Sequence, residues 1–148
     1  MNGNPMLICY DGSMESIHAI DTAAGLLGER PAVVVEVATP LTTAEALASL
    51  DTIPPPFEEW NGIEASRRAE HGAEYARSAG LTAEARGEIG APTWDGIVTV
   101  ADDSDAAVIV IGSRGLTGAR ELVEGSLSHQ VAEHAGRPVL VVPPPRGV

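Results

Sequence analysis

The sequence contains nine arginines but no lysine, and this absence removes several classes of function. A Walker P-loop places a lysine on the phosphates of its nucleotide, so that route to ATP binding is excluded. Schiff-base chemistry and the acyl enzymes of the Ser-x-x-Lys type are excluded for the same reason. Any site in this chain must use other side chains or the main chain.

Positive charge is scarce overall, because the net charge is −12 at pH 7. A protein that binds nucleic acid needs a basic patch to neutralise phosphates, and none is available here. We therefore expect no nucleic-acid partner. An anionic ligand would have to be held by local hydrogen-bond donors or by a bound cation.

Cysteine and long apolar runs are also lacking. The single cysteine, Cys9, cannot form an intramolecular disulfide, which is typical of a reducing cytosol, and we expect it to act as a small core residue. No apolar run approaches the ~18 residues of a membrane span, and no signal-peptide pattern opens the sequence. These features predict a cytoplasmic protein without a membrane partner. Its 148 residues fit one domain, 1–148.

What the chain does contain is an alternation of apolar strands and amphipathic helices. Strand patterns occupy residues 6–10, 32–37, 82–86, 106–111 and 139–142, and helical patterns occupy 13–27, 57–79, 92–101 and 126–135. Ser13 is expected to cap the first helix. In the third, Pro92 is expected at the first position, with a core face formed by Trp94, Ile97, Val98 and Ala101. The alternation predicts an α/β fold, a three-layer open sandwich with a parallel sheet of about five strands and helices on both faces.

The stretch from Ala106 to Ser128 carries the strongest functional signal. A buried apolar strand is followed by a loop containing Gly112, Gly115 and Gly125, and the helix after the loop opens at Ser126. Glycines let main-chain N–H groups approach an anion closely, and a helix N-terminus adds unpaired donors. The alternative is a purely structural role, in which the glycines form a turn before an ordinary capped helix. The combination of strand, glycine loop and helix start favours an anion site.

The spacing Gly112-x2-Gly115-x9-Gly125-Ser126 resembles the ATP loop, G-2x-G-9x-G-(S/T), of the nucleotide-binding branch of the universal stress protein family. The residues around it, 108–111 and 136–143, and the N-terminal residues 6–13 also resemble that family. The resemblance implies the strand order 3-2-1-4-5. In that order the first and fourth strands are neighbours at a topological switch point, where open α/β sheets bind ligands. Asp11 and Gly112 would then flank one crevice.

The resemblance also implies a ligand, ATP with Mg²⁺, and a set of binding residues: Asp11, Val37, Ile111, Gly112, Arg114, Gly115, Gly125, Ser126, Leu127 and Ser128. The loop glycines would offer main-chain donors to the phosphates, and the serine hydroxyls would add hydrogen bonds. The main chain of Val37 would meet the adenine edge. Asp11 would lie near the ribose, the phosphates and a metal, although it could simply form an Asx turn. Arg114 could bind phosphate or be solvated, as could Arg120.

Taken together, the sequence predicts an ATP-binding regulatory protein with no catalytic residues and little turnover. The resemblance implies a homodimer in which the last strand, Val139–Val142, pairs with its copy. Residues 39–56 are expected to form a mobile flap over the adenine side. The four histidines, His18, His71, His129 and His134, are expected at the surface rather than at a metal. Two alternatives stay open: a slow nucleotide hydrolase using Glu121 or Glu124, and a flavodoxin-like receiver that binds no nucleotide.

Overall fold

The structure, a computed structural model, describes residues 3–40, 57–114 and 126–146. The predicted alternation of strands and helices is present in these ranges. The elements in chain order are β1 (Met6–Cys9), α1 (Met14–Leu27), β2 (Ala32–Ala38), α3 (Phe57–Ser78), β3 (Ala83–Ile89), α4 (Thr93–Asp103), β4 (Val108–Gly112), α5 (Leu127–His134) and β5 (Val139–Val142). The predicted flap, 39–56, lies outside the described residues except for its first two positions.

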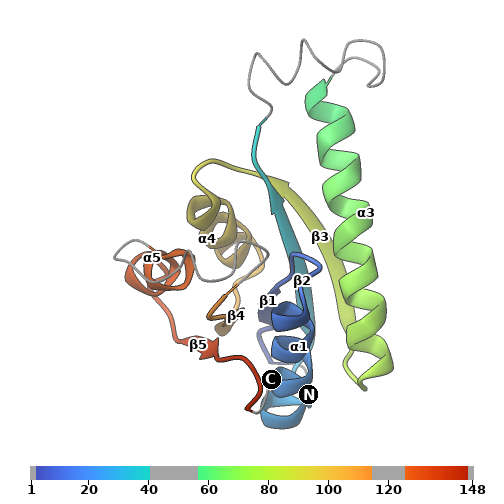
Figure 1. Cartoon of the computed structure of the whole chain (residues 1–148), viewed down its shortest axis with the longest axis vertical. Coiled ribbons are helices and arrows are strands. Elements are labelled where there is room, and N and C mark those ends of the chain that lie inside the picture. Colours follow the sequence, from blue (N-terminus) through green and yellow to red (C-terminus); the bar gives the residue numbers. More distant parts are fainter. Residues whose placement is uncertain (1–2, 41–56, 115–125, 147–148) are drawn as a thin grey trace.

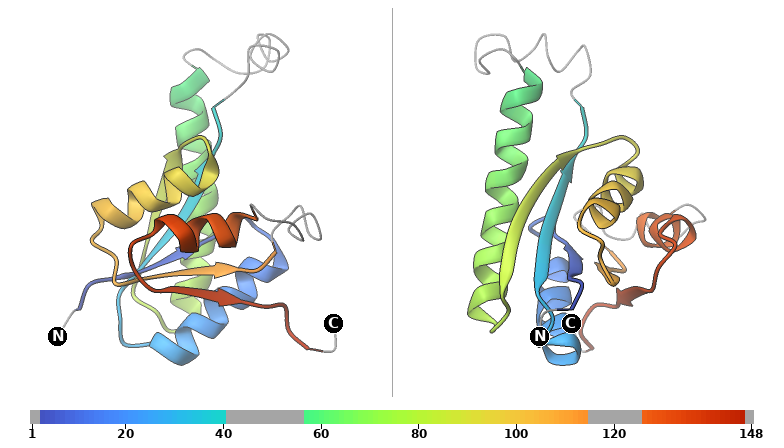
Figure 2. Two further views of the ribbon diagram at one scale, coloured as in Figure 1. Left: turned by 90° about the vertical axis from the view of Figure 1, so that its left-hand side faces the viewer. Right: turned by 180° about the vertical axis from the view of Figure 1, so that it is seen from behind.

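The five strands form one parallel sheet in the order β3-β2-β1-β4-β5, as predicted. β1 lies at the centre, where Met6 is opposite both Ala32 of β2 and Val108 of β4. Helices α1 and α3 cover one face of the sheet and α4 and α5 cover the other (Figures 1 and 2). The fold is therefore the expected three-layer open sandwich.

Each face of the sheet has its own apolar core. Met6 and Ile8 of β1 point into the core under α1 and α3, and Leu7 points into the core under α4 and α5. All three are fully buried. Strands that are buried on both faces explain why β1 and β4 read as unbroken apolar runs rather than as alternating patterns.

Helix α3 packs unusually close to the sheet because both surfaces carry small residues. Its buried hydrophobic residues in the described part are all alanines: Ala65, Ala69, Ala73 and Ala76. Opposite these alanines, a Cβ atom added to Gly87 of β3 would lie 2.3 Å from the backbone nitrogen of Ser66. The low content of large apolar residues in this helix is therefore matched to a short helix–sheet distance.

The ends of the helices follow their predicted signals with one exception. The Ser13 hydroxyl accepts a hydrogen bond from the Ser16 N–H at 3.1 Å and caps α1. Gly80, with φ of +99°, ends α3. The predicted start of α4 is one residue too early: Pro92 is the N-cap residue and the helix begins at Thr93. Val98 is partly exposed, and Val100 takes its predicted place in the core.

Two further searches cover only the described part of the chain. None of its helices is both long and apolar enough to cross a membrane. No group of three or more His, Cys, Asp or Glu side chains in it could bind a metal ion. His71, His129 and His134 are exposed, whereas His18 is partly buried. His134 stacks on Trp94 of α4 with 3.9 Å between ring centroids.

Candidate functional site

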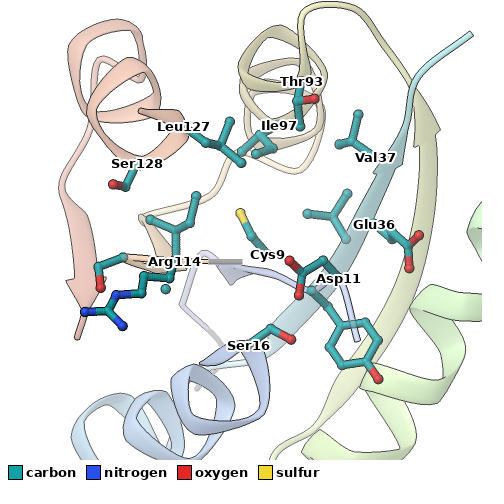
Figure 3. Close-up of a pocket in the computed structure, with 15 residues that line it drawn as sticks. Cys9, Asp11, Ser16, Glu36, Val37, Thr93, Ile97, Arg114, Leu127 and Ser128 are labelled. Atoms are coloured by element: carbon teal, nitrogen blue, oxygen red, sulfur yellow. The ribbon is translucent and has the colours of Figure 1, made fainter. Parts of the chain in front are cut away.

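A cavity of about 290 Å³ opens at the carboxyl ends of β1, β2 and β4, the place where the sequence predicts a crevice. Its walls come from these three strands and from the first turns of α1, α4 and α5 (Figure 3). The lining residues are Cys9, Tyr10, Asp11, Ser16, Val35, Glu36, Val37, Thr93, Ile97, Ile111, Gly112, Ser113, Arg114, Leu127 and Ser128.

The cavity exists because β1 stops before β2 does. The last pair between these strands joins Cys9 to Val35, whereas β2 continues to Ala38. Successive residues of a strand turn their main-chain groups to opposite neighbours. The carbonyl of Val35 accepts from the Tyr10 N–H on the β1 side at 2.9 Å, and that of Ala38 accepts from the Gly90 N–H on the β3 side at 3.0 Å. The N–H and C=O of Val37 therefore face the β1 side, into the gap beyond the end of β1.

Apolar side chains form the walls of the cavity next to Val37. Ile97 of α4 and Ile111 of β4 are almost fully buried, and Leu127 stands at the start of α5. Figure 3 shows Val37, Ile97 and Leu127 around the same opening. This part of the cavity suits a flat apolar group that also carries polar atoms along one edge.

Asp11 lies at the other side of the cavity and has a structural role. Its Oδ1 atom accepts a hydrogen bond from the Ser13 N–H at 2.9 Å, which is an Asx turn leading into α1. Figure 3 shows the carboxylate directed towards the middle of the cavity. The Asx turn, which the sequence analysis gave as the purely structural alternative for Asp11, is thus present. It also fixes the position of the carboxylate at the cavity.

The charge of Asp11 affects three neighbouring groups. Burial raises the pKa of Cys9 to about 12, with Asp11 adding to the rise. Burial and then the negative charges of Glu36 and Asp11 raise the pKa of Tyr10. The pKa of Glu36 is also raised, mainly by burial, with Asp11 contributing less. Burial is the main cause in each case, and the negative charge of Asp11 adds to it.

Glu36 belongs to the cavity mainly through its position on β2, because its side chain turns away towards α3 (Figure 3). One oxygen, Oε1, forms an ion pair with the guanidinium of Arg68. The other, Oε2, is buried and has no hydrogen-bond partner in the described part of the chain. The pKa of Glu36 is raised because burial outweighs the effect of Arg68. This carboxylate attaches α3 to the strand that supplies Val37.

The end of β4 and the start of α5 form the third side of the cavity. Gly112, Arg114 and Ser128 line it. A Cβ atom on Gly112 would lie 3.1 Å from the carbonyl oxygen of Arg114 and 3.5 Å from the Cβ of Glu15, so this glycine lets the chain turn tightly against α1. Ser126 caps α5, and its hydroxyl accepts from the His129 N–H at 3.3 Å. Ser126 does not line the cavity.

The structure thus brings together seven of the ten predicted binding residues around one cavity: Asp11, Val37, Ile111, Gly112, Arg114, Leu127 and Ser128. Ser126 does not line the cavity but directly precedes Leu127, which does. Gly115 and Gly125 lie outside the described residues. The sequence analysis missed Ser16 and Thr93 as lining residues, and it assigned Ile97 only to the core. A position in the first turn of a helix is the signal that Ser16 and Thr93 share.

Comparisons with known proteins agree on one family. Residues 4–143 match the universal stress protein family. Universal stress protein YxiE of Bacillus subtilis (strain 168) is 33% identical over 146 residues, which cover 94% of this chain and 98% of that protein.

Two solved structures are similar along almost the whole chain. A universal stress protein in complex with cAMP is 23% identical, with a TM-score of 0.68 and coverage of 94% of this chain and 96% of that one. The universal stress protein from Archaeoglobus fulgidus in complex with dAMP is also 23% identical, with a TM-score of 0.64 and coverage of 96% and 99%. The family match, the relative in Bacillus and the shared fold lead to one conclusion: this chain belongs to the universal stress protein family.

Proposed function

We propose that this protein binds an adenine nucleotide, ATP with Mg²⁺, in the cavity at the ends of β1, β2 and β4, and that it acts in the cytoplasm as a regulatory module. The observation that carries the proposal is the outward-facing main chain of Val37 beside an apolar opening. Two similar structures hold cAMP and dAMP, which supports an adenine nucleotide as the class of ligand.

The base fits the Val37 side of the cavity. Adenine presents an N–H donor, its 6-amino group, directly beside an acceptor, N1. The C=O and N–H of one residue offer the complementary acceptor and donor, and both groups need partners when a ligand shields them from water. The side chains of Ile97, Ile111 and Leu127 would cover the ring faces. Main-chain recognition also explains why the sequence shows no polar side chain at this position.

The phosphates fit the opposite side, between Gly112 and Ser128. The N-terminus of α5 reaches this side through Ser128, and Arg114 lines the same wall. Asp11 is the carboxylate that would hold Mg²⁺, which is commonly bound by one or two carboxylates together with phosphate oxygens. A bound Mg²⁺ would offset the repulsion between Asp11 and the phosphates.

A regulatory role rather than catalysis is proposed because no described residue is placed as a general base. Two carboxylates line the described part of the cavity, Asp11 and Glu36. The first is held in an Asx turn and the second points towards α3. Glu121 and Glu124, on which the hydrolase alternative depends, lie outside the described residues. We expect ATP turnover far below the ~10 s⁻¹ typical of enzymes.

The Val37 main chain can be tested directly. ATP with Mg²⁺ at a hundredfold its dissociation constant should stabilise the wild type by ~2.7 kcal/mol in thermal unfolding. Val37→Pro removes the N–H that faces the cavity without removing a donor to β3, so it should lose most of this shift. Val37→Ile keeps the N–H and should retain the shift. A wild type that shows no shift with ATP would refute the proposal.

We also propose that the protein is a homodimer formed through β5. The Pro138 and Val142 carbonyls accept hydrogen bonds from the β4 side, at 3.0 Å and 2.9 Å. Val139 and Val141 therefore turn their main-chain groups outward, and the Val141 side chain is 40% exposed. A strand edge with free donors and acceptors is usually covered in native proteins. A second copy, paired antiparallel, would cover it.

A further inference from the structure

We propose that Thr93, at the first turn of α4, binds the base of the nucleotide through its hydroxyl group and so strengthens binding of the base. The inference rests on the proposed function and adds a contact to it. The contact of Thr93 would come from a side chain of α4, whereas those of Val37 would come from the main chain of β2.

The position of Thr93 is fixed by a close contact between α4 and the end of β2. A Cβ atom on Gly96 would lie 2.7 Å from Cγ1 of Val37, and one on Gly90 would lie 2.9 Å from the Cα of Gly96. Both glycines therefore allow α4 to come closer to β2 than any other residue would. The same contact brings Thr93 to the cavity that Val37 faces (Figure 3).

The chemistry of Thr93 differs from that of its surroundings. Its neighbours in the cavity wall, Val37 and Ile97, are apolar. The Thr93 hydroxyl makes no hydrogen bond within the described part of the chain, and the side chain is only partly exposed. Pro92, the N-cap residue, provides no side-chain cap for α4. The first turn of α4 thus places a hydroxyl at the cavity, beside the main chain of Val37 and the apolar side chain of Ile97.

A hydroxyl can donate to a ring nitrogen or accept from an amino group, and both occur on the edges of adenine. Phosphate is an unsuitable partner here, because Gly112 and Ser128 lie on other walls of the cavity, formed by β4 and α5. The geometry therefore assigns the Thr93 hydroxyl to the base.

Two substitutions separate the hydroxyl from the methyl group of Thr93. Thr93→Val keeps the shape and removes the hydroxyl, and Thr93→Ser keeps the hydroxyl and removes the methyl group. Thr93 is partly exposed in the first turn of α4, so both variants should fold. Affinity for ATP with Mg²⁺ is measured by isothermal titration calorimetry for each variant and for the wild type.

We expect Thr93→Val to bind ATP about five- to tenfold more weakly, the usual effect of one hydrogen bond, and Thr93→Ser to stay within about twofold of the wild type. Equal affinity of Thr93→Val and the wild type would overturn the inference and leave the proposed function intact. Equal losses in both variants would also overturn it, because they would show that Thr93 acts by packing. A wild type that binds no ATP would overturn both.

Discussion

Replacing Gly87 with alanine tests the close packing of α3 against β3. The new Cβ atom would lie 2.3 Å from the backbone nitrogen of Ser66 and 2.7 Å from the carbonyl carbon of Ala65. Backbone atoms cannot rotate away, so either α3 or β3 must shift. Overpacking of this kind costs ~1–3 kcal/mol, and relief of the glycine's strand penalty returns at most ~1 kcal/mol. We expect a net loss of about 1–2 kcal/mol, which is about 2–8 °C in the melting temperature of a domain of this size.

Gly62 provides the matched control on the same interface. Among the described residues, a Cβ atom there would meet only the Cδ1 atom of Ile89, at 3.6 Å, which is an ordinary contact. Because Gly62 lies inside α3, alanine should stabilise the helix by up to ~1 kcal/mol. Thermal and urea unfolding of the two variants should therefore move in opposite directions from the wild type. If Gly87→Ala were as stable as Gly62→Ala, the described helix–sheet distance would be wrong.

Three further predictions concern charge, reactivity and assembly. Arg68→Met should cost about 1–2 kcal/mol, a figure reduced because the Arg68 side chain is 43% exposed. The pKa of Glu36 is already raised above 4.5, so this carboxyl stabilises the fold below that pH and loses its contribution as the pH rises through its folded value. Without Arg68 the pKa of Glu36 rises further. The loss of unfolding free energy in Arg68→Met, measured by urea unfolding, should therefore grow between about pH 5 and about pH 7. Arg67→Met, at an exposed position, is the control and should show no such growth. Cys9, with a pKa of about 12, should react with iodoacetamide at about pH 8 roughly 10³-fold more slowly than free cysteine, and fast alkylation would contradict this raised pKa. Val141→Pro removes an N–H that faces away from β4, so light scattering should give the mass of one 15.3 kDa chain for this variant and twice that for the wild type. An unchanged mass would disprove the β5 interface.

The sequence was sufficient to predict the fold because its signals agree with one another. Apolar runs marked the buried strands, Ser13 and Gly80 marked helix ends, and the resemblance supplied a strand order that the structure reproduces. The error at Pro92 has a simple cause. A proline that suits the first helical position also suits the N-cap, because neither needs a backbone N–H, and periodicity cannot separate adjacent positions.

The site was only partly predictable because several of its features are not side-chain patterns. The motif spacing pointed to Gly112 and the family resemblance pointed to Asp11, and the structure brings both to one cavity. Thr93 carries no motif, and its place depends on the contact of Gly96 with Val37, two residues that are far apart in the sequence. The pairing of Glu36 with Arg68 likewise depends on how α3 lies on the sheet. Such contacts arise only from tertiary packing.

The unequal lengths of β1 and β2 have a consequence for how this site could change during evolution. β1 has four residues and β2 has seven, so no part of β1 lies opposite Val37. In the proposed complex the base takes the place of that missing strand segment. Recognition of the base would then depend on the main chain of Val37, and the side chain would be constrained by its packing against Gly96. An extension of β1 by two residues would instead fill the vacancy with protein and remove the site, even with every predicted binding residue retained.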